Sequence, residues 1–259
     1  MSTIIYPSPI FGPVHSRRLG LSLGVNLMPG DGKLCTFDCI YCECGFNAAH
    51  RPRMRRPTRF EVSDRLREVL SSMQQAGHLP DVITFAGNGE PTCHPDFPAI
   101  IRDTLMLRDE FAPNCKISVL SNATMIHHEE VKSALLLVDN NILKLDTVDP
   151  AYIRRVDRPT SSHYDVEAII RDMEDFHGHV VIQSMFMKGF SEGVDVDNTG
   201  DSYVLPWLEA IQRIRPREVM VYTIDRETPA KGLEKASPSD LDRIRDLVLS
   251  RGIPCTASY

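Results

Sequence analysis

The chain has 259 residues, of which 42% are hydrophobic and 25% are charged. These values are ordinary for globular proteins, so overall disorder, a collagen-like repeat and a coiled coil are excluded. The formal net charge of −6 argues against a protein that coats nucleic acid with its whole surface. No run of about 18 apolar residues occurs, so no transmembrane helix and no membrane partner are expected. The first residues lack a basic start and a long apolar stretch, and we therefore expect no secretory signal.

Strand-like and helix-like segments alternate along the sequence. Nearly continuous apolar runs, typical of buried parallel strands, occur at residues 21–28, 82–86, 117–120, 142–145, 180–187 and 219–222. Apolar residues with helical spacing lie between or after them, at 66–73, 97–105, 131–138, 166–173, 208–214 and 241–248. This alternation predicts an α/β fold, a partial (β/α)6 TIM-type barrel with parallel strands. The polar, acidic stretch 189–201 is expected to be a surface loop.

The same pattern predicts one domain. A prior of about 150 residues per domain allows one or two domains, but single α/β barrels reach about 250 residues. The sequence has no repeat, no low-complexity tract and no clear linker. We expect a single domain over residues 1–259, with the barrel extending to about residue 251. In such a barrel the carboxyl ends of the strands carry the chemistry.

Four of the seven cysteines fall within ten residues, namely Cys35, Cys39, Cys42 and Cys44. Such a cluster, in a chain without a secretory signal, indicates a metal site in the reducing cytoplasm. Cys35, Cys39 and Cys42 have the spacing C-x3-C-x2-C, in a loop at residues 29–45 that follows the first predicted strand. Three thiolates can hold three irons of a 4Fe–4S cluster and leave the fourth iron open, whereas electron-transfer clusters ordinarily use four cysteines.

Cys44 lies outside this three-thiol pattern, and we expect it to be a neighbouring thiol rather than a ligand. A zinc ion held by all four thiols is the alternative. Structural zinc sites usually take two pairs of ligands from separated loops. A single short loop is cramped for that tetrahedral arrangement, so the sequence favours the cluster.

The cysteine spacing, with the aromatic Tyr41 before the third cysteine, resembles the motif of the radical S-adenosylmethionine (SAM) superfamily. The resemblance implies a 4Fe–4S cluster and SAM as cofactors, with SAM chelated by the open iron. It implies that one electron, from a cellular donor such as flavodoxin or ferredoxin, cleaves SAM to methionine and a 5′-deoxyadenosyl radical. That radical would abstract a hydrogen atom from a substrate.

A second motif, GNGEP, follows the second predicted strand and resembles the superfamily's GGEP-type motif. In the superfamily the backbone and glutamate of that motif receive the amino group of SAM's methionine. After the third strand, Ser121 and Asn122 can bind the methionine carboxylate or the ribose, or cap the next helix. The expected SAM-binding residues are Tyr41, Gly87, Asn88, Gly89, Glu90, Pro91, Ser121, Asn122, Asp146, Gln183 and Tyr222.

Three further segments narrow the resemblance: residues 12–20 (GPVHSRRLG), 156–159 (VDRP) and 222–226 (YTIDR). They resemble one branch of the superfamily, the wyosine-type tRNA-modifying enzymes and their bacterial and archaeal relatives. Two departures argue against transferring that reaction. The wyosine-forming enzymes hold a second cluster with upstream cysteines, and this chain has none before Cys35. Glu227 also stands where a proline is expected after the YTIDR segment.

The substrate prediction depends on arginines. Five of them lie between Arg51 and Arg59, with no acidic residue between Glu43 and Glu61. Arginine forks match phosphate oxygens, and a local basic patch can bind RNA even on an acidic protein. The alternative is a solvated loop that pairs with acidic helices elsewhere. The expected substrate-binding residues are Arg17, Arg18, Arg51, Arg53, Arg55, Arg56, Lys144 and Arg226.

Three functions follow from these observations. The first is a radical SAM enzyme that modifies RNA, with a tRNA base as the specific candidate. The second is a radical SAM enzyme that modifies or activates a peptide or protein. The third is a non-catalytic metal-binding or electron-transfer module.

Overall fold

The computed structural model of the chain describes residues 3–16 and 20–259. Its main sheet has the strand order β1-β2-β3-β4-β5-β6-β9-β11. Neighbouring strands are parallel throughout, except that β1 runs antiparallel to β2. The strands are β1 (Ile10–Ser16), β2 (Gly20–Val25), β3 (Val82–Phe85), β4 (Lys116–Ser121), β5 (Asn140–Lys144), β6 (Val181–Met185), β9 (Glu218–Tyr222) and β11 (Cys255–Ser258). The six predicted strands therefore form the parallel sheet in their chain order, which confirms the α/β fold.

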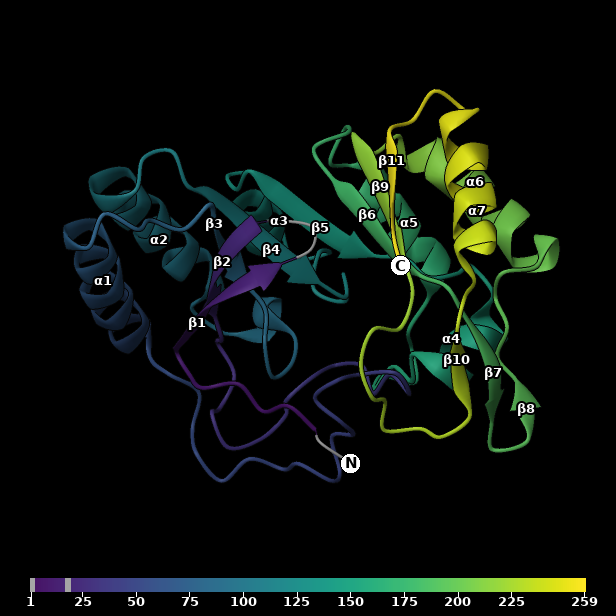
Figure 1. Cartoon of the computed structure of the whole chain (residues 1–259), viewed down its shortest axis with the longest axis horizontal. Coiled ribbons are helices and arrows are strands. Elements are labelled where there is room, and N and C mark those ends of the chain that lie inside the picture. The colour runs from purple at the N-terminus through teal and green to yellow at the C-terminus, as the bar shows by residue number, and fades with distance from the viewer. Residues whose placement is uncertain (1–2, 17–19) are drawn as a thin grey trace.

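Helices cover the outside of this sheet (Figure 1). Their apolar stripes supply the core, as in α1, which buries Val62, Leu66 and Leu70. Trp207 of α6 is fully buried and donates its indole N–H to the Leu145 carbonyl oxygen at 2.9 Å. The helices are α1 (Arg59–Gln75), α2 (Phe97–Phe111), α3 (Glu129–Leu135), α4 (Pro150–Val156), α5 (Val166–Glu174), α6 (Asp201–Ile214) and α7 (Pro238–Leu249), with a 3₁₀ turn η1 (Pro91–Cys93).

The structure corrects three predicted boundaries. The predicted strand 180–187 divides into β6 and β7 (Met187–Ser191), which belong to different sheets. The predicted loop 189–201 includes the end of β7 and the strand β8 (Val194–Asp195). The sheet also continues beyond residue 251 into β11. A continuous apolar run does not record where a strand changes partner, so periodicity alone did not separate β6 from β7.

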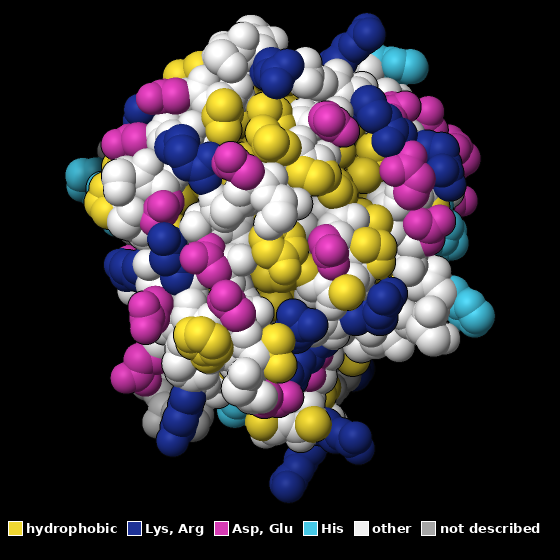
Figure 2. All heavy atoms as spheres, turned by 90° about the vertical axis from the view of Figure 1, so that its right-hand side faces the viewer, with side chains coloured by type: hydrophobic (Ala, Val, Ile, Leu, Met, Phe, Trp, Pro, Cys, Tyr) yellow, Lys and Arg dark blue, Asp and Glu magenta, His cyan; other side chains and the backbone are white. Residues whose placement is uncertain are grey.

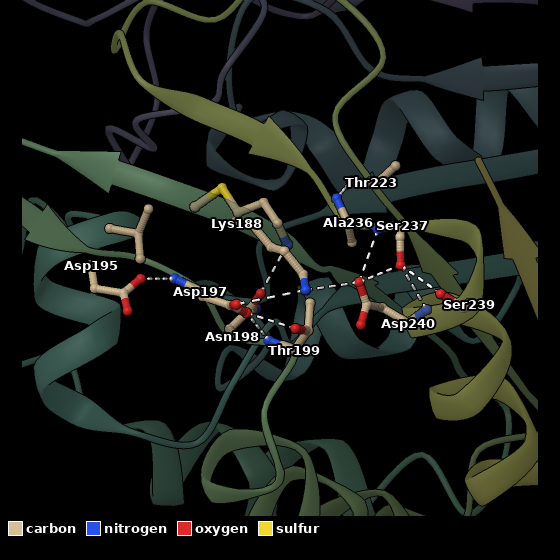
Figure 3. A network of polar contacts seen from close by, with 12 residues as sticks. Lys188, Asp195, Asp197, Asn198, Thr199, Thr223, Ala236, Ser237, Ser239 and Asp240 are labelled. Carbon is tan, nitrogen blue, oxygen red and sulfur yellow. Dashed lines mark hydrogen bonds and ion pairs between the residues drawn. The ribbon is translucent and has the colours of Figure 1, made fainter.

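A small sheet, β10-β7-β8, lies beside the main one, with β10 spanning Leu233–Lys235. A polar network fastens it to the start of α7 (Figure 3). Lys188 of β7 reaches Asp240 at 3.0 Å and Asp197 at 3.9 Å. Asp240 also forms the capping box of α7 with Ser237. The network therefore fixes the small sheet to the same helix that packs on β11. The small sheet lies at the same end of the molecule as the segment between β2 and α1 (Figure 1).

Among the described residues, none of the helices is both long and apolar enough to span a bilayer. The face over α6 and α7 carries acidic and basic side chains interleaved with apolar ones (Figure 2). Lys and Arg side chains project at its lower end (Figure 2).

Candidate active site

The cysteine loop, residues 29–45, is pinned against loops that follow other elements. Leu34 forms an isolated parallel bridge with Gly89, and its N–H donates to the Asn88 carbonyl oxygen at 2.8 Å. On the other side, the N–H of Ile40 donates to the Val156 carbonyl oxygen at 2.9 Å, at the end of α4. The loop therefore lies across the carboxyl ends of the barrel strands, as the fold class predicts.

Cys35, Cys39 and Cys42 are half-buried free thiols on this loop. The Sγ atom of Cys35 accepts a hydrogen bond from the N–H of Phe37 at 3.5 Å. Burial raises the pKa of Cys35 to about 12, and the nearby Glu90 carboxylate adds to this rise. Since iron binds thiolates, loading the site releases these protons.

Lys33 is a residue that the sequence interpretation missed. It is only 2% exposed, and its ammonium donates to the Gly45 carbonyl oxygen at 2.6 Å. Burial alone would lower its pKa, but Cys42, Cys35 and Cys39 together raise it above the usual value. All three thiols therefore lie close to one buried positive charge. A lysine two residues before a cysteine motif is the signal that could have pointed to it.

Cys44 is buried and donates from Sγ to the Gly87 carbonyl oxygen at 3.3 Å. A hydrogen bond with Cys44 lowers the pKa of Cys42 to about 6, although burial opposes this. Cys44 thus contacts the GNGEP loop and a predicted ligand, and its place outside the ligand set stays a prediction.

The donor set fits a 4Fe–4S cluster with three protein ligands. Three sulfur atoms lie on one loop, beside a buried cation that stabilises their thiolate forms, and thiolates are the ligands of such clusters. Within the described ranges, no three His, Cys, Asp or Glu side chains converge as the ligands of a single metal ion.

The GNGEP loop needs its glycines because of the cysteine loop. At Gly89, with φ of +148°, an added Cβ atom would lie 1.9 Å from the Leu34 carbonyl oxygen. Close approach of protein backbone therefore explains this glycine. Asn88 is fully buried, and its side-chain amide donates to the carbonyl oxygens of Tyr6 and Pro29 at 2.8 and 2.9 Å. Its side chain holds the loops together, and its contact with SAM stays a prediction.

Glu90 connects the GNGEP loop to the loop after β4. One carboxylate oxygen accepts from Thr92, at 3.0 Å from the N–H and 2.6 Å from the hydroxyl, and caps η1. The other accepts from the N–H of Asn122 at 2.6 Å. Asn122 in turn donates to the Thr36 hydroxyl at 2.8 Å, beside Cys35. Burial raises the pKa of Glu90, and these donors oppose the rise.

The structure thus brings together Glu90, Asn122 and the cysteine loop. The alternative that Ser121 or Asn122 caps the next helix is wrong, because His128 is the N-cap of α3. Pro91 occupies the first position of η1, a favourable place for proline.

Lys144, Tyr41 and Asp146 form a buried polar cluster at the end of β5. The Lys144 ammonium contacts the Asp146 carboxylate, and it lies 2.8 Å from Asp157 Oδ1 and 2.5 Å from the Tyr41 hydroxyl. That hydroxyl also donates to Asp146. Burial alone would lower the pKa of Lys144, but Asp146 and Asp157 raise it well above its usual range. Lys144 therefore lies between the carboxyl groups of Asp146 and Asp157, and its role in substrate binding stays a prediction.

Gln183 and Tyr222 lie on the strands beside this cluster. Gln183 of β6 is directly opposite Lys144 in the parallel register, and Tyr222 ends β9. The charge of Tyr222 contributes to the raised pKa of Tyr41, after larger effects of burial and Asp146, so the two side chains are neighbours. Asp146, which follows β5, and Tyr222, which ends β9, therefore lie at the carboxyl ends of these strands, and Gln183 lies within β6 beside Lys144.

The predicted substrate arginines divide into two groups. Arg55 pairs with Glu61 at 2.6 Å, and Arg226 pairs with Glu43 at 2.7 Å, so both are engaged within the protein. In the described part of the chain no ion pair involves Arg51, Arg53 or Arg56. Arg17 and Arg18 lie outside the described residues. Arg55 therefore pairs with the helix that directly follows the loop, and the substrate-binding role of Arg51, Arg53 and Arg56 stays a prediction.

The sequence model of the Radical SAM superfamily matches residues 31–196. The chain therefore belongs to the radical SAM superfamily of enzymes, whose cofactors are a 4Fe–4S cluster and SAM. Membership favours the cluster over zinc, and an enzyme over the non-catalytic module.

Within the superfamily, the chain belongs to the UPF0026 family. A UPF0026 protein of Helicobacter pylori (strain J99 / ATCC 700824) is 30% identical to it, over 86% of this chain and 68% of the relative. UPF0026 protein slr1464 of Synechocystis sp. is 30% identical, over 87% of this chain and 78% of the relative. A third, from Helicobacter pylori (strain ATCC 700392 / 26695), is 31% identical over 73% of this chain, which spans 59% of that relative.

Solved structures of low identity share the fold. A radical SAM methyltransferase from Sphaerobacter thermophilus superposes with a TM-score of 0.67 at 17% identity, over 92% of this chain and 66% of that one. TYW1 with a bound lysine–pyruvate adduct superposes with a TM-score of 0.64 at 13% identity, over 88% of this chain and 73% of that one. Streptococcus suis SuiB bound to SAM superposes with a TM-score of 0.63 at 15% identity, over 91% of this chain and 50% of that one. These likenesses support the partial barrel and carry no reaction over to this chain.

Proposed function

We propose that this chain is a radical SAM enzyme that acts on an RNA, with a tRNA base as the specific target. The observation that carries the substrate class is the loop of residues 51–58. Arg51, Arg53 and Arg56 have no ion pair among the described residues, although the chain has 35 acidic side chains. The loop is continuous with the cysteine loop. Unpaired arginines next to a reactive centre suit phosphates, which carry charge on every nucleotide. The sequence resemblance to the tRNA-modifying branch supports the specific target.

When bound, the cluster and SAM together supply a 5′-deoxyadenosyl radical. In this proposal Cys35, Cys39 and Cys42 hold the cluster, and Lys33 stabilises their thiolates. Glu90 and Asn122 keep the GNGEP loop against the cysteine loop, so that its backbone can orient the methionine end of SAM. Tyr41, Asp146, Gln183 and Tyr222 would line the remainder of the SAM site.

Condensation with pyruvate is not part of the proposal, although TYW1 has been solved with a lysine–pyruvate adduct. A lysine must lose its proton before it can attack a carbonyl group. The two buried lysines near the cysteine loop, Lys33 and Lys144, both have a raised pKa because of the negative groups around them.

The proposal includes a cytoplasmic location and a flavodoxin- or ferredoxin-type electron donor. All seven cysteines are free thiols, which suits a reducing compartment.

The proposed function is tested with protein reconstituted anaerobically with iron and sulfide. We expect 5′-deoxyadenosine formation to increase when bulk tRNA is added, and mass spectrometry of the digested tRNA to show a changed nucleoside. The same tRNA hydrolysed to nucleosides is the matched control and should give no increase. An increase with peptides but not with tRNA would contradict the RNA proposal and favour a peptide substrate.

A further inference from the structure

A cleft of about 550 Å³ lies between the cysteine loop and the loop of residues 51–58. Its walls include Leu34 of the cysteine loop, Met54 and Arg56 of the arginine-rich loop, and His94, which follows η1. We call it the Arg56 cleft. The cleft is shallow and widely open to solvent, so a ligand would lie on its surface rather than be enclosed. Because Leu34 precedes Cys35, the cleft adjoins the predicted cluster.

Arg56 brings a positive charge to this cleft, and Asp96 also lines the cleft without forming an ion pair with Arg56 in the described part of the chain. Its Nε atom is sealed from solvent and has no hydrogen-bond partner among the described residues. Its neighbours in sequence differ, since Arg55 pairs with Glu61 and Arg59 pairs with Asp103, each at 2.6 Å. Because Nε is sealed, a ligand in the cleft would meet the terminal nitrogens of the guanidinium group, and no ion pair within the described residues joins that group to a carboxylate.

Arg56 lines the cleft together with His94, which directly follows η1. Burial is the main cause of the lowered pKa of His94; the Pro57 carbonyl oxygen and the Asp96 carboxylate oppose it, and the charge of Arg56 adds a smaller lowering effect. Burial also raises the pKa of Cys93 to about 11, and there Arg56 acts in the opposite direction. Both residues follow Glu90 within four positions. The unpaired charge is therefore close to the GNGEP motif as well as to the cysteine loop.

The wall of the cleft is fixed in place before any ligand binds. His94 is buried, and its Nε2 lies 2.8 Å from the Pro57 carbonyl oxygen. Its Nδ1 accepts from the N–H of Asp96 at 3.1 Å, so Nε2 carries the proton and donates to Pro57. At the other end, the Asp31 carboxylate accepts from the N–H groups of Arg53 and Met54, the first at 2.9 Å. A preorganised loop loses little entropy on binding.

Apolar side chains complete the cleft. Leu34 is 37% exposed and Met54 is 62% exposed, although both are large and hydrophobic. Exposed apolar surface beside a cation matches a ligand with a flat apolar face and an attached anion. A nucleotide has this combination, because its base can lie on apolar side chains while arginine holds its phosphate. A simple anion would leave the apolar wall without a partner.

We propose that the Arg56 cleft binds one nucleotide of the RNA substrate, next to the nucleotide that reacts, with its phosphate on Arg56 and its base against Leu34 and Met54. This inference rests on the proposed function, because it assumes an RNA substrate. It adds a defined subsite and separates Arg56 from the other arginines of the loop.

The test compares two charge-removing variants of the reconstituted protein, Arg56→Gln and Arg65→Gln. Arg65 is the matched control, because it is exposed on α1 and pairs with Glu68 away from the cleft. Binding of fluorescein-labelled tRNA is measured by anisotropy. We expect Arg56→Gln to weaken binding about tenfold or more, as for loss of a charge-assisted hydrogen bond. Arg65→Gln should leave it within about twofold, since exposed pairs contribute little.

A second measurement tests the apolar wall and does not depend on how the Arg56 variant folds. tRNA containing 4-thiouridine should photo-crosslink to wild-type protein at the peptide that carries Met54. Crosslinks elsewhere, with none on that peptide, would overturn the proposed subsite.

The outcomes also separate the cleft from the proposed function. If wild-type protein does not bind tRNA, both the RNA substrate and the cleft proposal fail. If it binds tRNA and the two variants bind equally well, the cleft proposal fails while the proposed function stands.

Discussion

Lys33 and Lys144 are two buried lysines near the cysteine loop, and different groups balance each of them. Lys33 faces three thiols and Asp38, whereas Lys144 faces Asp146 and Asp157. Lys33 therefore lies beside the predicted cluster ligands, whereas Lys144 lies in the polar cluster at the end of β5. Removing Lys144 takes away the buried cation that faces Asp146 and Asp157, which is costly in a protein interior.

This reasoning gives a stability prediction for Lys144→Met. The substitution should lower the free energy of unfolding by about 3–5 kcal/mol, because it leaves two carboxylates unpaired. Denaturant unfolding under anaerobic conditions measures the change. Lys235→Met is the control, since its pair with Asp225 spans 3.9 Å and its side chain is 55% exposed. That variant should lose less than about 1 kcal/mol, and similar losses in both would contradict the prediction.

Glu90 gives a second prediction at this scale. Glu90→Ala should weaken SAM binding, because Glu90 orients the GNGEP loop. The iron content should stay unchanged, because Glu90 is not one of the predicted cluster ligands. Loss of a charge-assisted hydrogen bond corresponds to about tenfold to a hundredfold in affinity. Equilibrium dialysis with labelled SAM measures it. An unchanged affinity would show that SAM binds elsewhere.

Among the elements, α1 begins with a complete capping box that ends the arginine-rich loop. The Thr58 side chain caps the N–H of Glu61, and Glu61 caps the N–H of Thr58. Thr58→Ala should cost about 1 kcal/mol of stability. His128→Ala is the control, because His128 is the N-cap of α3 but makes no side-chain cap bond. Thermal unfolding of both variants decides this, and an equal loss would contradict the role of the box.

The arginine-rich loop itself gives a salt-dependence prediction. Replacing Arg51 and Arg53 by alanine should reduce the log–log salt slope of tRNA binding by about one unit for each phosphate that the variant no longer neutralises. Arg55→Ala should reduce it less, because Arg55 already pairs with Glu61. Anisotropy titrations at several salt concentrations measure the slopes. A larger effect of Arg55 would contradict this division of the loop.

In the whole molecule, the parallel sheet and the cysteine loop could be predicted because they depend on local signals. Strands and helices have their own periodicities, and C-x3-C-x2-C is contiguous in sequence. Long-range pairings could not be predicted. Asp157 reaches Lys144 only because α4 turns the chain back, and Arg59 meets Asp103 only when α1 packs on α2. The break at Phe186 between β6 and β7 could not be predicted either, because it depends on which distant strands each of the two pairs with.

The prediction of a single domain also belongs to the whole molecule. One hydrophobic cluster runs from Leu23 of β2 to Val248 of α7, so the two ends of the chain share a core. We expect one cooperative transition in calorimetry of the apo-protein. Two separated transitions would indicate that the halves of the barrel unfold independently.

The central claim is that three thiols of one loop hold the cluster on which SAM cleavage depends. The direct measurement is iron, sulfide and 5′-deoxyadenosine in single alanine variants of Cys35, Cys39, Cys42 and Cys44 after anaerobic reconstitution. Loss of all three quantities is predicted for Cys35, Cys39 and Cys42, while Cys44→Ala should keep its iron and cleave SAM. A Cys35, Cys39 or Cys42 variant that retained iron and cleaved SAM as well as wild type would contradict the claim.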